Sequence, residues 1–185
     1  MNARIENKLR VAEPLDKVWL LLKDPRQVVG CVPGAQITET IDDHTFKGSI
    51  KVKVGPIVTE YKGDVAISRL DEEKHEMELT GKGQDVRGKG SATMVMTSNL
   101  TSLPDGGTEV SAVAQISVAG MLAQFGGRVI NDVSDILFKE FANRFGQLLS
   151  GGESAQTSAE PVSATKLMGS VIGAKFRKMV GSSEE

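Results

Sequence analysis

The stretch "TFKGSIKVKVGPIVTEYKGDVAI", residues 45–67, decides the fold class of this 185-residue chain. From Phe46 to Val54, apolar residues and glycine alternate with lysine and serine, and the same alternation resumes after Gly55-Pro56. A period of two predicts strands with one buried face, and the glycine-proline pair predicts the break between them. The stretch therefore predicts two neighbouring antiparallel strands that turn their apolar positions to the same side.

The alternating pattern extends in both directions from this pair. Residues 4–11 form one such run, and further short runs continue from Ala35 to about Val118 with polar turns between them. Short connections favour the pairing of sequential strands, so we expect an antiparallel meander. The segment "PLDKVWLLLKDP", residues 14–25, interrupts the strands and predicts a helix that has Pro14 in its first turn and ends before Pro25.

From Met121 to Leu149 the apolar residues recur at steps of three and four, which predicts one long amphipathic helix. The apolar stripe of this helix needs a partner surface, and the sheet is the only candidate of sufficient size. Gly126-Gly127 indicates a kink or a site of close approach, because a glycine inside a helix costs about 1 kcal/mol relative to alanine. The predicted fold class is thus α+β, with a curved antiparallel sheet around a long C-terminal helix.

Glycines recur on the faces that the alternation assigns as inward: Gly48, Gly63, Gly81, Gly88 and Gly90. Glycine in a strand leaves volume unfilled. One interpretation is that these glycines let strongly curved strands wrap the helix without clashes. The other is a cavity between sheet and helix, and the residues alone do not decide between the two.

Methionines are adaptable apolar side chains, and their number among the inward positions suits either a loose core or a pocket for a flexible apolar ligand. In such a pocket the polar side chains of Asn7 and Tyr61 would orient a ligand headgroup. The residues expected to line it are Asn7, Phe46, Tyr61, Met77, Met94, Met96, Ala114, Leu122, Phe125 and Val129.

A Walker-type phosphate loop, a GxGxxG motif after a strand, an HExxH motif and a CxxC motif do not occur in the sequence. His44 and His75 have no metal-ligand spacing to each other or to Cys31, so we expect no metal site and interpret Cys31 as a small buried hydrophobic residue. The inward positions offer no convergent acid and base, so no catalytic residues are expected, and a cyclase-like enzyme ranks last. A formal net charge of −2 gives no basic field for nucleic acid.

Three landmarks carry a family resemblance: "CVPGA" at residues 31–35, "VGP" at 54–56 and "GGT" at 106–108. With the strand and helix patterns around them, residues 1–149 resemble the carbon monoxide dehydrogenase CoxG family of the START-like, or SRPBCC, superfamily. The resemblance implies a helix-grip fold over an apolar cavity. It also implies a non-catalytic accessory that helps to place an aerobic molybdenum-containing carbon monoxide dehydrogenase at the membrane.

The rest of the chain differs in composition from this domain. Residues 150–163 are small and polar and predict a flexible linker, whereas residues 164–185 predict an amphipathic, membrane-interacting tail. A tail helix docked on the domain and a disordered end are the alternatives to an interfacial helix with a basic rim. We expect reversible, salt-sensitive attachment through Leu167, Met168, Val171, Ile172, Lys175, Phe176, Arg177, Lys178 and Met179.

The resulting hypothesis is an accessory protein that binds a hydrophobic molecule and links the dehydrogenase, or a related hydroxylase, to membrane electron transport. The ligand expected is a respiratory quinone such as menaquinone or ubiquinone, or another isoprenoid lipid, with no covalent cofactor. One alternative is a recruitment module without ligand carriage, and another is a general lipid-binding START-like protein. A single cysteine, no signal-peptide pattern and no long apolar run predict a cytoplasmic protein, peripheral at the inner face of the cell membrane.

Overall fold

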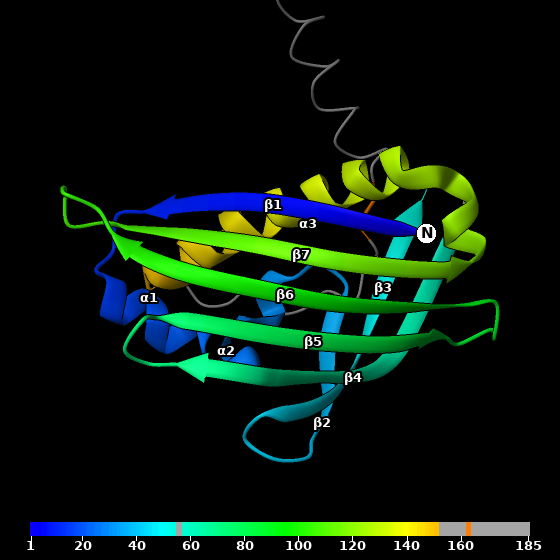
Figure 1. The fold of residues 1–185 in the computed structure, drawn as a ribbon, viewed down its shortest axis with the longest axis horizontal. Helices are drawn as coiled ribbons and strands as arrows, with labels where there is room; N and C mark the ends of the chain where they lie inside the picture. The colour runs from blue at the N-terminus through cyan, green and yellow to red at the C-terminus, as the bar shows by residue number, and fades with distance from the viewer. Residues whose placement is uncertain (55–56, 152–161, 164–185) are drawn as a thin grey trace, which may run out of the picture.

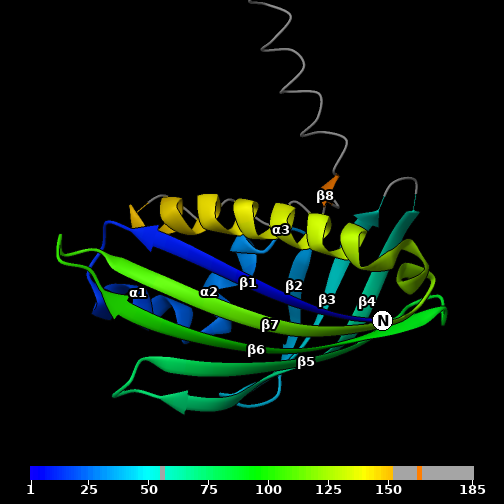
Figure 2. The ribbon, with the colours of Figure 1, turned by 45° about the horizontal axis from the view of Figure 1, so that its top comes forward.

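The computed structural model describes residues 1–54, 57–151 and 162–163. Its main element is a curved antiparallel sheet, seen face on in Figure 1, with α3 lying across its inner side in Figure 2. The strand order is β1-β7-β6-β5-β4-β3-β2, and the short β8 pairs with β3. The strands are β1 (Asn2–Val11), β2 (Ala35–Thr40), β3 (Thr45–Val54), β4 (Ile57–Asp71), β5 (Glu76–Asp85), β6 (Gly90–Ser102), β7 (Thr108–Gly120) and β8 (Val162–Ser163).

The predicted meander is confirmed, because each strand from β2 to β7 pairs antiparallel with the next. In the β3–β4 hairpin, Phe46 lies opposite Val65. β1 adds to the far edge, where Ile5 lies opposite Ala114 on β7. Side chains in register share a face of the sheet. One such row crosses five strands and consists of Phe46, Val65, Gly81, Met94 and Ile116.

The connection between β1 and β2 is helical: α1 (Leu15–Leu22), α2 (Pro25–Val28) and the 3-10 turn η1 (Val29–Cys31). Pro25 follows the end of α1, as expected, and is also the first residue of α2, a position where its missing N–H costs nothing. The side chain of Asp24 caps α2 by accepting a 3.0 Å hydrogen bond from the backbone N–H of Arg26. The chain therefore turns sharply here and covers one end of the sheet.

The long C-terminal helix begins later than predicted. Residues Met121–Phe125 form a 3-10 turn, η2, and the α-helix α3 spans Gly126–Leu149. Gly126 has a φ of 79°, in the left-handed region that favours glycine. No atom lies within 4 Å of the position that a Cβ would take at Gly126 or Gly127, so the pair marks a break rather than a close approach.

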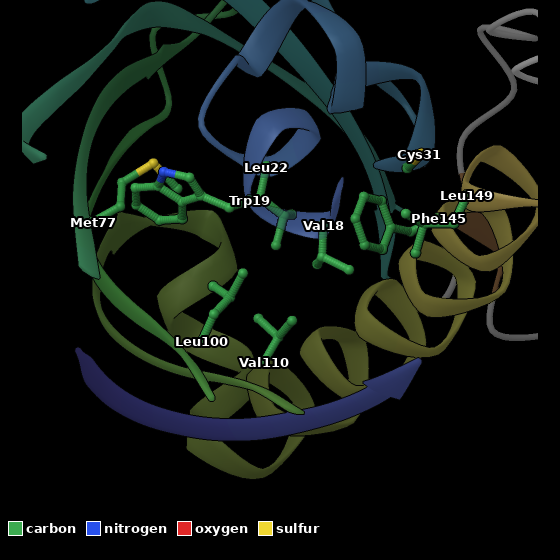
Figure 3. Close-up of a cluster of buried hydrophobic side chains, with 9 residues drawn as sticks. All are labelled: Val18, Trp19, Leu22, Cys31, Met77, Leu100, Val110, Phe145 and Leu149. Carbon is green, nitrogen blue, oxygen red and sulfur yellow. The ribbon is translucent and has the colours of Figure 1, made fainter. Parts of the chain in front are cut away.

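Two hydrophobic clusters hold α3 to the sheet. The first joins α1 to the last turns of α3, and Figure 3 shows its side chains meeting inside the curve of the strands. It contains Val18, Trp19, Leu22, Cys31, Met77, Leu100, Val110, Phe145 and Leu149. The second lies around η2 and the start of α3, and contains Val54, Tyr61, Val118 and Leu122. The core is therefore divided between the two ends of α3.

A row of glycines bends the sheet. Gly48 lies opposite Gly63, and Gly63 lies opposite Gly83. A Cβ at Gly63 would overlap the carbonyl oxygen of Lys82, and one at Gly48 would lie 2.7 Å from the carbonyl oxygen of Gln36. Backbone atoms of neighbouring strands thus approach too closely for any side chain, which supports the curvature interpretation for this row.

Two other glycines behave differently. A Cβ at Gly81 would meet no atom closer than the Cε of Met94 at 3.7 Å, so the inner face has room there. Gly88, by contrast, was wrongly assigned as inward. It is exposed in the turn between β5 and β6 with a φ of 70°, which makes it a turn residue that takes no part in the inner face.

Candidate functional site

The residues predicted to line a cavity all lie on the inner side of the fold. Seven belong to strands: Asn7 on β1, Phe46 on β3, Tyr61 on β4, Met77 on β5, Met94 and Met96 on β6, and Ala114 on β7. The register places these seven on the same face as the buried Ile5, the face that α3 covers. The remaining three belong to η2 and α3: Leu122, Phe125 and Val129.

The structure distributes these residues among the two clusters and the space between them. Met77 belongs to the first cluster, whereas Tyr61 and Leu122 belong to the second, with Phe125 and Val129 packed against it. Five residues belong to neither cluster: Asn7, Phe46, Met94, Met96 and Ala114. The predicted site therefore corresponds to the middle of the inner face, between the two packed ends.

The middle of the inner face is incompletely covered. Met94, Met96 and Ala114 come from central strands and face α3, yet each is only half-buried, whereas Phe46 in the same region is 1% exposed. Inward side chains of central strands are normally enclosed, because protein interiors are close-packed. Their remaining accessible surface means that, among the described residues, neither α3 nor the loops cover these side chains completely.

Polar side chains border this part of the interior. Asn7 and Ser98 lie in the same row of the inner face and make no side-chain hydrogen bond to any described residue. Among the described residues, no fully enclosed side-chain nitrogen or oxygen lacks a partner. The amide of Asn7 and the hydroxyl of Ser98 therefore adjoin space that a small polar group can enter.

A second polar group lies beside Tyr61, where β4 and β5 pair. Asp85 lies opposite Tyr61 and is 7% exposed. Its carboxylate accepts a 3.0 Å hydrogen bond from the hydroxyl of Thr59 and a 2.8 Å bond from the backbone N–H of Arg87. Burial, and then the charge of Asp85, raises the pKa of Tyr61, so its hydroxyl stays protonated at neutral pH and can donate a hydrogen bond.

Sequence reasoning missed Asp85 and Ser98 as polar members of the inner face. The alternation of β4 does place Thr59 on the face of Tyr61, but Thr59 was not named among the polar groups of the site. The signal was present for Asp85, because the alternation through Met77 and Gly81 continues to Gly83 and Asp85. For Tyr61, no hydrogen-bond partner occurs among the described residues, which leaves its hydroxyl available to a ligand.

A groove of about 670 Å³ lies elsewhere, on the outer surface between α1 and the end of α3. It is wide open and contains none of the ten predicted residues. Its lining residues are Glu13, Lys17, Leu20, Leu21, Leu148, Leu149, Ser150 and Gly151. We do not identify it with the ligand site, because a site for an apolar molecule must remove most of the ligand surface from water.

Other predicted features can be placed only in part. The nine residues predicted to bind the membrane, from Leu167 to Met179, lie outside the described residues. Within the described part of the chain, no helix is both long and apolar enough to cross a bilayer. Cys31 is 2% exposed in the first cluster, as predicted, and burial raises the pKa of its thiol.

The described residues contain no evident metal-binding site. Across residues 1–54, 57–151 and 162–163, no three His, Cys, Asp or Glu side chains gather as a metal site would require. The chemistry that this interior offers is apolar contact with a few hydrogen-bonding groups.

Comparison with known proteins agrees with this geometry. Residues 8–150 match the model of the carbon monoxide dehydrogenase CoxG family. The chain belongs to this family. No curated protein matches the sequence.

Solved structures resemble this CoxG-family chain in fold. A conserved protein from Geobacillus kaustophilus has a TM-score of 0.70 at 19% identity, with 82% of this chain and 96% of that chain covered. A START superfamily protein from Mycobacterium smegmatis has a TM-score of 0.57 at 10% identity, with coverage of 80% and 97%. The Zhui aromatase/cyclase from a Streptomyces species has a TM-score of 0.57 at 15% identity, with coverage of 88% and 100%.

These comparisons confirm the predicted family and the START-like helix-grip fold. Membership in the CoxG family associates the chain with carbon monoxide dehydrogenase, and family and fold together indicate a ligand-binding accessory protein. Proteins with this family and fold are generally non-catalytic, although the aromatase/cyclase among the structural neighbours is an enzyme.

Proposed function

We propose that this protein carries a respiratory quinone between the membrane and a molybdenum-containing carbon monoxide dehydrogenase or related hydroxylase. A dehydrogenase that releases electrons outside the bilayer needs an acceptor, and quinones reside within the bilayer. A carrier with an apolar interior solves this transfer without being a catalyst itself. The observation that carries the proposal is the incompletely covered inner face at Met94, Met96 and Ala114.

The interior suits a molecule with a long apolar part. Methionine side chains adapt to irregular apolar shapes, and Gly81 in the row of Met94 adds volume rather than a side chain. An isoprenoid tail would replace the missing packing contacts there. The second cluster then closes one end of this space, and the first cluster closes the other.

A quinone ring also needs hydrogen-bond donors for its carbonyl oxygens. Tyr61 supplies a protonated hydroxyl from a position that is 6% exposed. The Asn7 amide lies in the row of Met77, toward the other end of the inner face, so it would contact a different part of the ligand from Tyr61. Asp85 is less suited to act as a general base, because both of its oxygens already accept hydrogen bonds. These contacts favour binding over catalysis.

The carrier function is tested by blocking the interior. Ala114→Phe places a large ring on the inner face, and Gln115→Phe, on the next residue of β7, points the same ring to the exposed outer face. We expect bound quinone, measured by solvent extraction of the purified full-length protein, to fall at least tenfold in Ala114→Phe and to be unchanged in Gln115→Phe. Equal quinone content in both variants would contradict the proposed interior site.

The rival function is a recruitment module whose interior carries nothing. Deletion of residues 163–185 and the Ala114→Phe variant separate the two functions when carbon monoxide oxidation is coupled to membrane oxygen consumption. If the protein is a carrier, the tail deletion and Ala114→Phe should each abolish the coupling of carbon monoxide oxidation to oxygen consumption. A recruitment module loses coupling with the deletion alone and works normally with a filled interior.

A further inference from the structure

The two ends of the sheet differ in charge. The meander brings the β4–β5 and β6–β7 turns to the end near α1, and the β5–β6 turn to the other end, beside η2 (Figure 1). The turns near α1 carry three acids and one lysine: Glu72, Glu73, Asp105 and Lys74. The turn beside η2 carries Arg87 and Lys89, both exposed, and no acid. The field of the molecule is therefore more positive at the η2 end.

The η2 end also exposes apolar side chains along one continuous edge of strands. Val58 near the start of β4 is 39% exposed, and Val86 after β5 is 49% exposed. The backbone N–H of Val86 donates to the carbonyl of Glu60, so the two valines lie on neighbouring strands. Further along, Lys89 accepts a hydrogen bond from Met121, and the amino group of Met1, itself 36% exposed, donates to Val118.

The chain beyond α3 returns to this same end. β8 pairs with β3, with Ser163 opposite Lys53, and Lys53 in turn lies opposite Val58. The basic and apolar sequence of residues 166–180 therefore starts only three positions after a residue placed at the η2 end. In sequence, a segment with the same combination of cations and apolar residues thus follows directly on a residue placed at this end.

We propose that the η2 end of the domain, formed by Met1, Val58, Val86, Arg87 and Lys89, is itself a docking surface for an anionic phospholipid bilayer. Exposed cations next to exposed apolar side chains match a surface of anionic headgroups above acyl chains. This inference deepens the proposed function, because docking here would turn the end that contains Tyr61 and Asp85 toward the membrane.

A vesicle-binding experiment with the full-length protein tests the surface. The variant combines Arg87→Glu with Lys89→Glu, and its matched control combines Lys17→Glu with Lys74→Glu near α1. A basic residue close to an anionic surface contributes about fivefold in affinity. With vesicles of equimolar phosphatidylglycerol and phosphatidylcholine, we expect the first variant to bind at least tenfold more weakly and the control less than twofold. Equal loss in both would overturn the docking surface.

A second measurement tests which end of the domain faces the bilayer, and it does not rely on the charge-reversal variants. An environment-sensitive fluorophore is attached at Val86→Cys or, for comparison, at Asp105→Cys in the β6–β7 turn, while the native Cys31 is buried. We expect the emission to shift to the blue on vesicle addition at position 86 only. No shift at position 86 with vesicles, together with a shift when the dehydrogenase is added, would overturn the proposal and assign this end to a protein partner.

The outcomes separate this inference from the proposed function. If deletion of residues 164–185 abolishes vesicle binding and the Arg87 and Lys89 changes do not weaken it, the docking surface fails while tail attachment stands. If bound quinone is absent but the fluorophore at position 86 enters the bilayer, the carrier function fails while the docking surface stands.

Discussion

Alanine substitutions at Gly63 and Gly81 distinguish crowding from free space on the inner face. Both glycines lie on the inner face of central strands, and both residues lack the left-handed φ that would strain alanine. At Gly63 an added Cβ would overlap the carbonyl oxygen of Lys82 and lie 2.8 Å from the Cα of Gly83. These are backbone atoms of the paired strand, so relief requires β4 and β5 to move apart.

The expected magnitudes follow from these contacts. Overpacking of a well-packed interior costs roughly 1–3 kcal/mol, and rigid backbone obstacles place Gly63→Ala at the upper end, about 3 kcal/mol. At Gly81 the nearest atoms are Cε and Cβ of Met94 at 3.7 and 3.8 Å, which is ordinary contact. Gly81→Ala should leave stability unchanged or raise it by up to about 1 kcal/mol, because alanine restricts the unfolded chain.

The assay is urea denaturation of both variants, followed by far-ultraviolet circular dichroism. For a domain of this size, a loss of about 3 kcal/mol also lowers the melting temperature by roughly 6–12 °C. Comparable destabilisation of both variants would mean that the inner face is as full at Gly81 as at Gly63. A stable Gly63→Ala would refute the explanation of the bend.

Two further predictions concern polar contacts. Hydrogen bonds from Trp19 and then from Lys23 lower the pKa of Glu72 below its ordinary value of 4.5. The stabilisation from these two hydrogen bonds is therefore present above pH 4.5 and is lost as the pH falls through the lowered pKa of Glu72. Trp19 is the single tryptophan of the chain. Its fluorescence should therefore show a transition below pH 4.5, and Glu72→Gln should remove that transition. Thr59→Val should reduce the free energy of unfolding by about 1.5–3 kcal/mol, because the Asp85 carboxylate loses a buried hydrogen-bond donor. Thr59→Ser keeps a hydroxyl donor and should retain most of the wild-type stability. Equal stability of the valine and serine variants would contradict this role.

Much of the sheet followed from the period of two. Once strands are identified, alternation fixes which residues share a face, and the register confirms this for the row from Phe46 to Ile116. Asp85 was missed because the inward positions were followed from Gly81 directly to Gly88, although the alternation continues through Gly83 to Asp85 at the end of β5. The period-two alternation was sufficient to predict which residues share a face of the sheet, and it was less reliable for predicting where a strand ends.

Other features depend on contacts that local sequence does not contain. The crowding at Gly63 arises from the approach of Lys82, nineteen positions away in sequence, and depends on how strongly β4 and β5 coil. Gly126 was a recognisable irregularity, but only its backbone conformation separates a break from a close approach. The division of the core into two clusters depends on which residues of α3, α1 and η2 meet in the folded chain, which periodicity does not encode.

The central claim is that the space between the two clusters holds a quinone. Native mass spectrometry of the full-length protein, purified from quinone-producing cells without added ligand, measures this directly. We predict a bound species with the mass of the host menaquinone or ubiquinone, reduced at least tenfold by Ala114→Phe and retained in Gln115→Phe. A protein that carries no isoprenoid, or the same quinone content in both variants, would contradict the account.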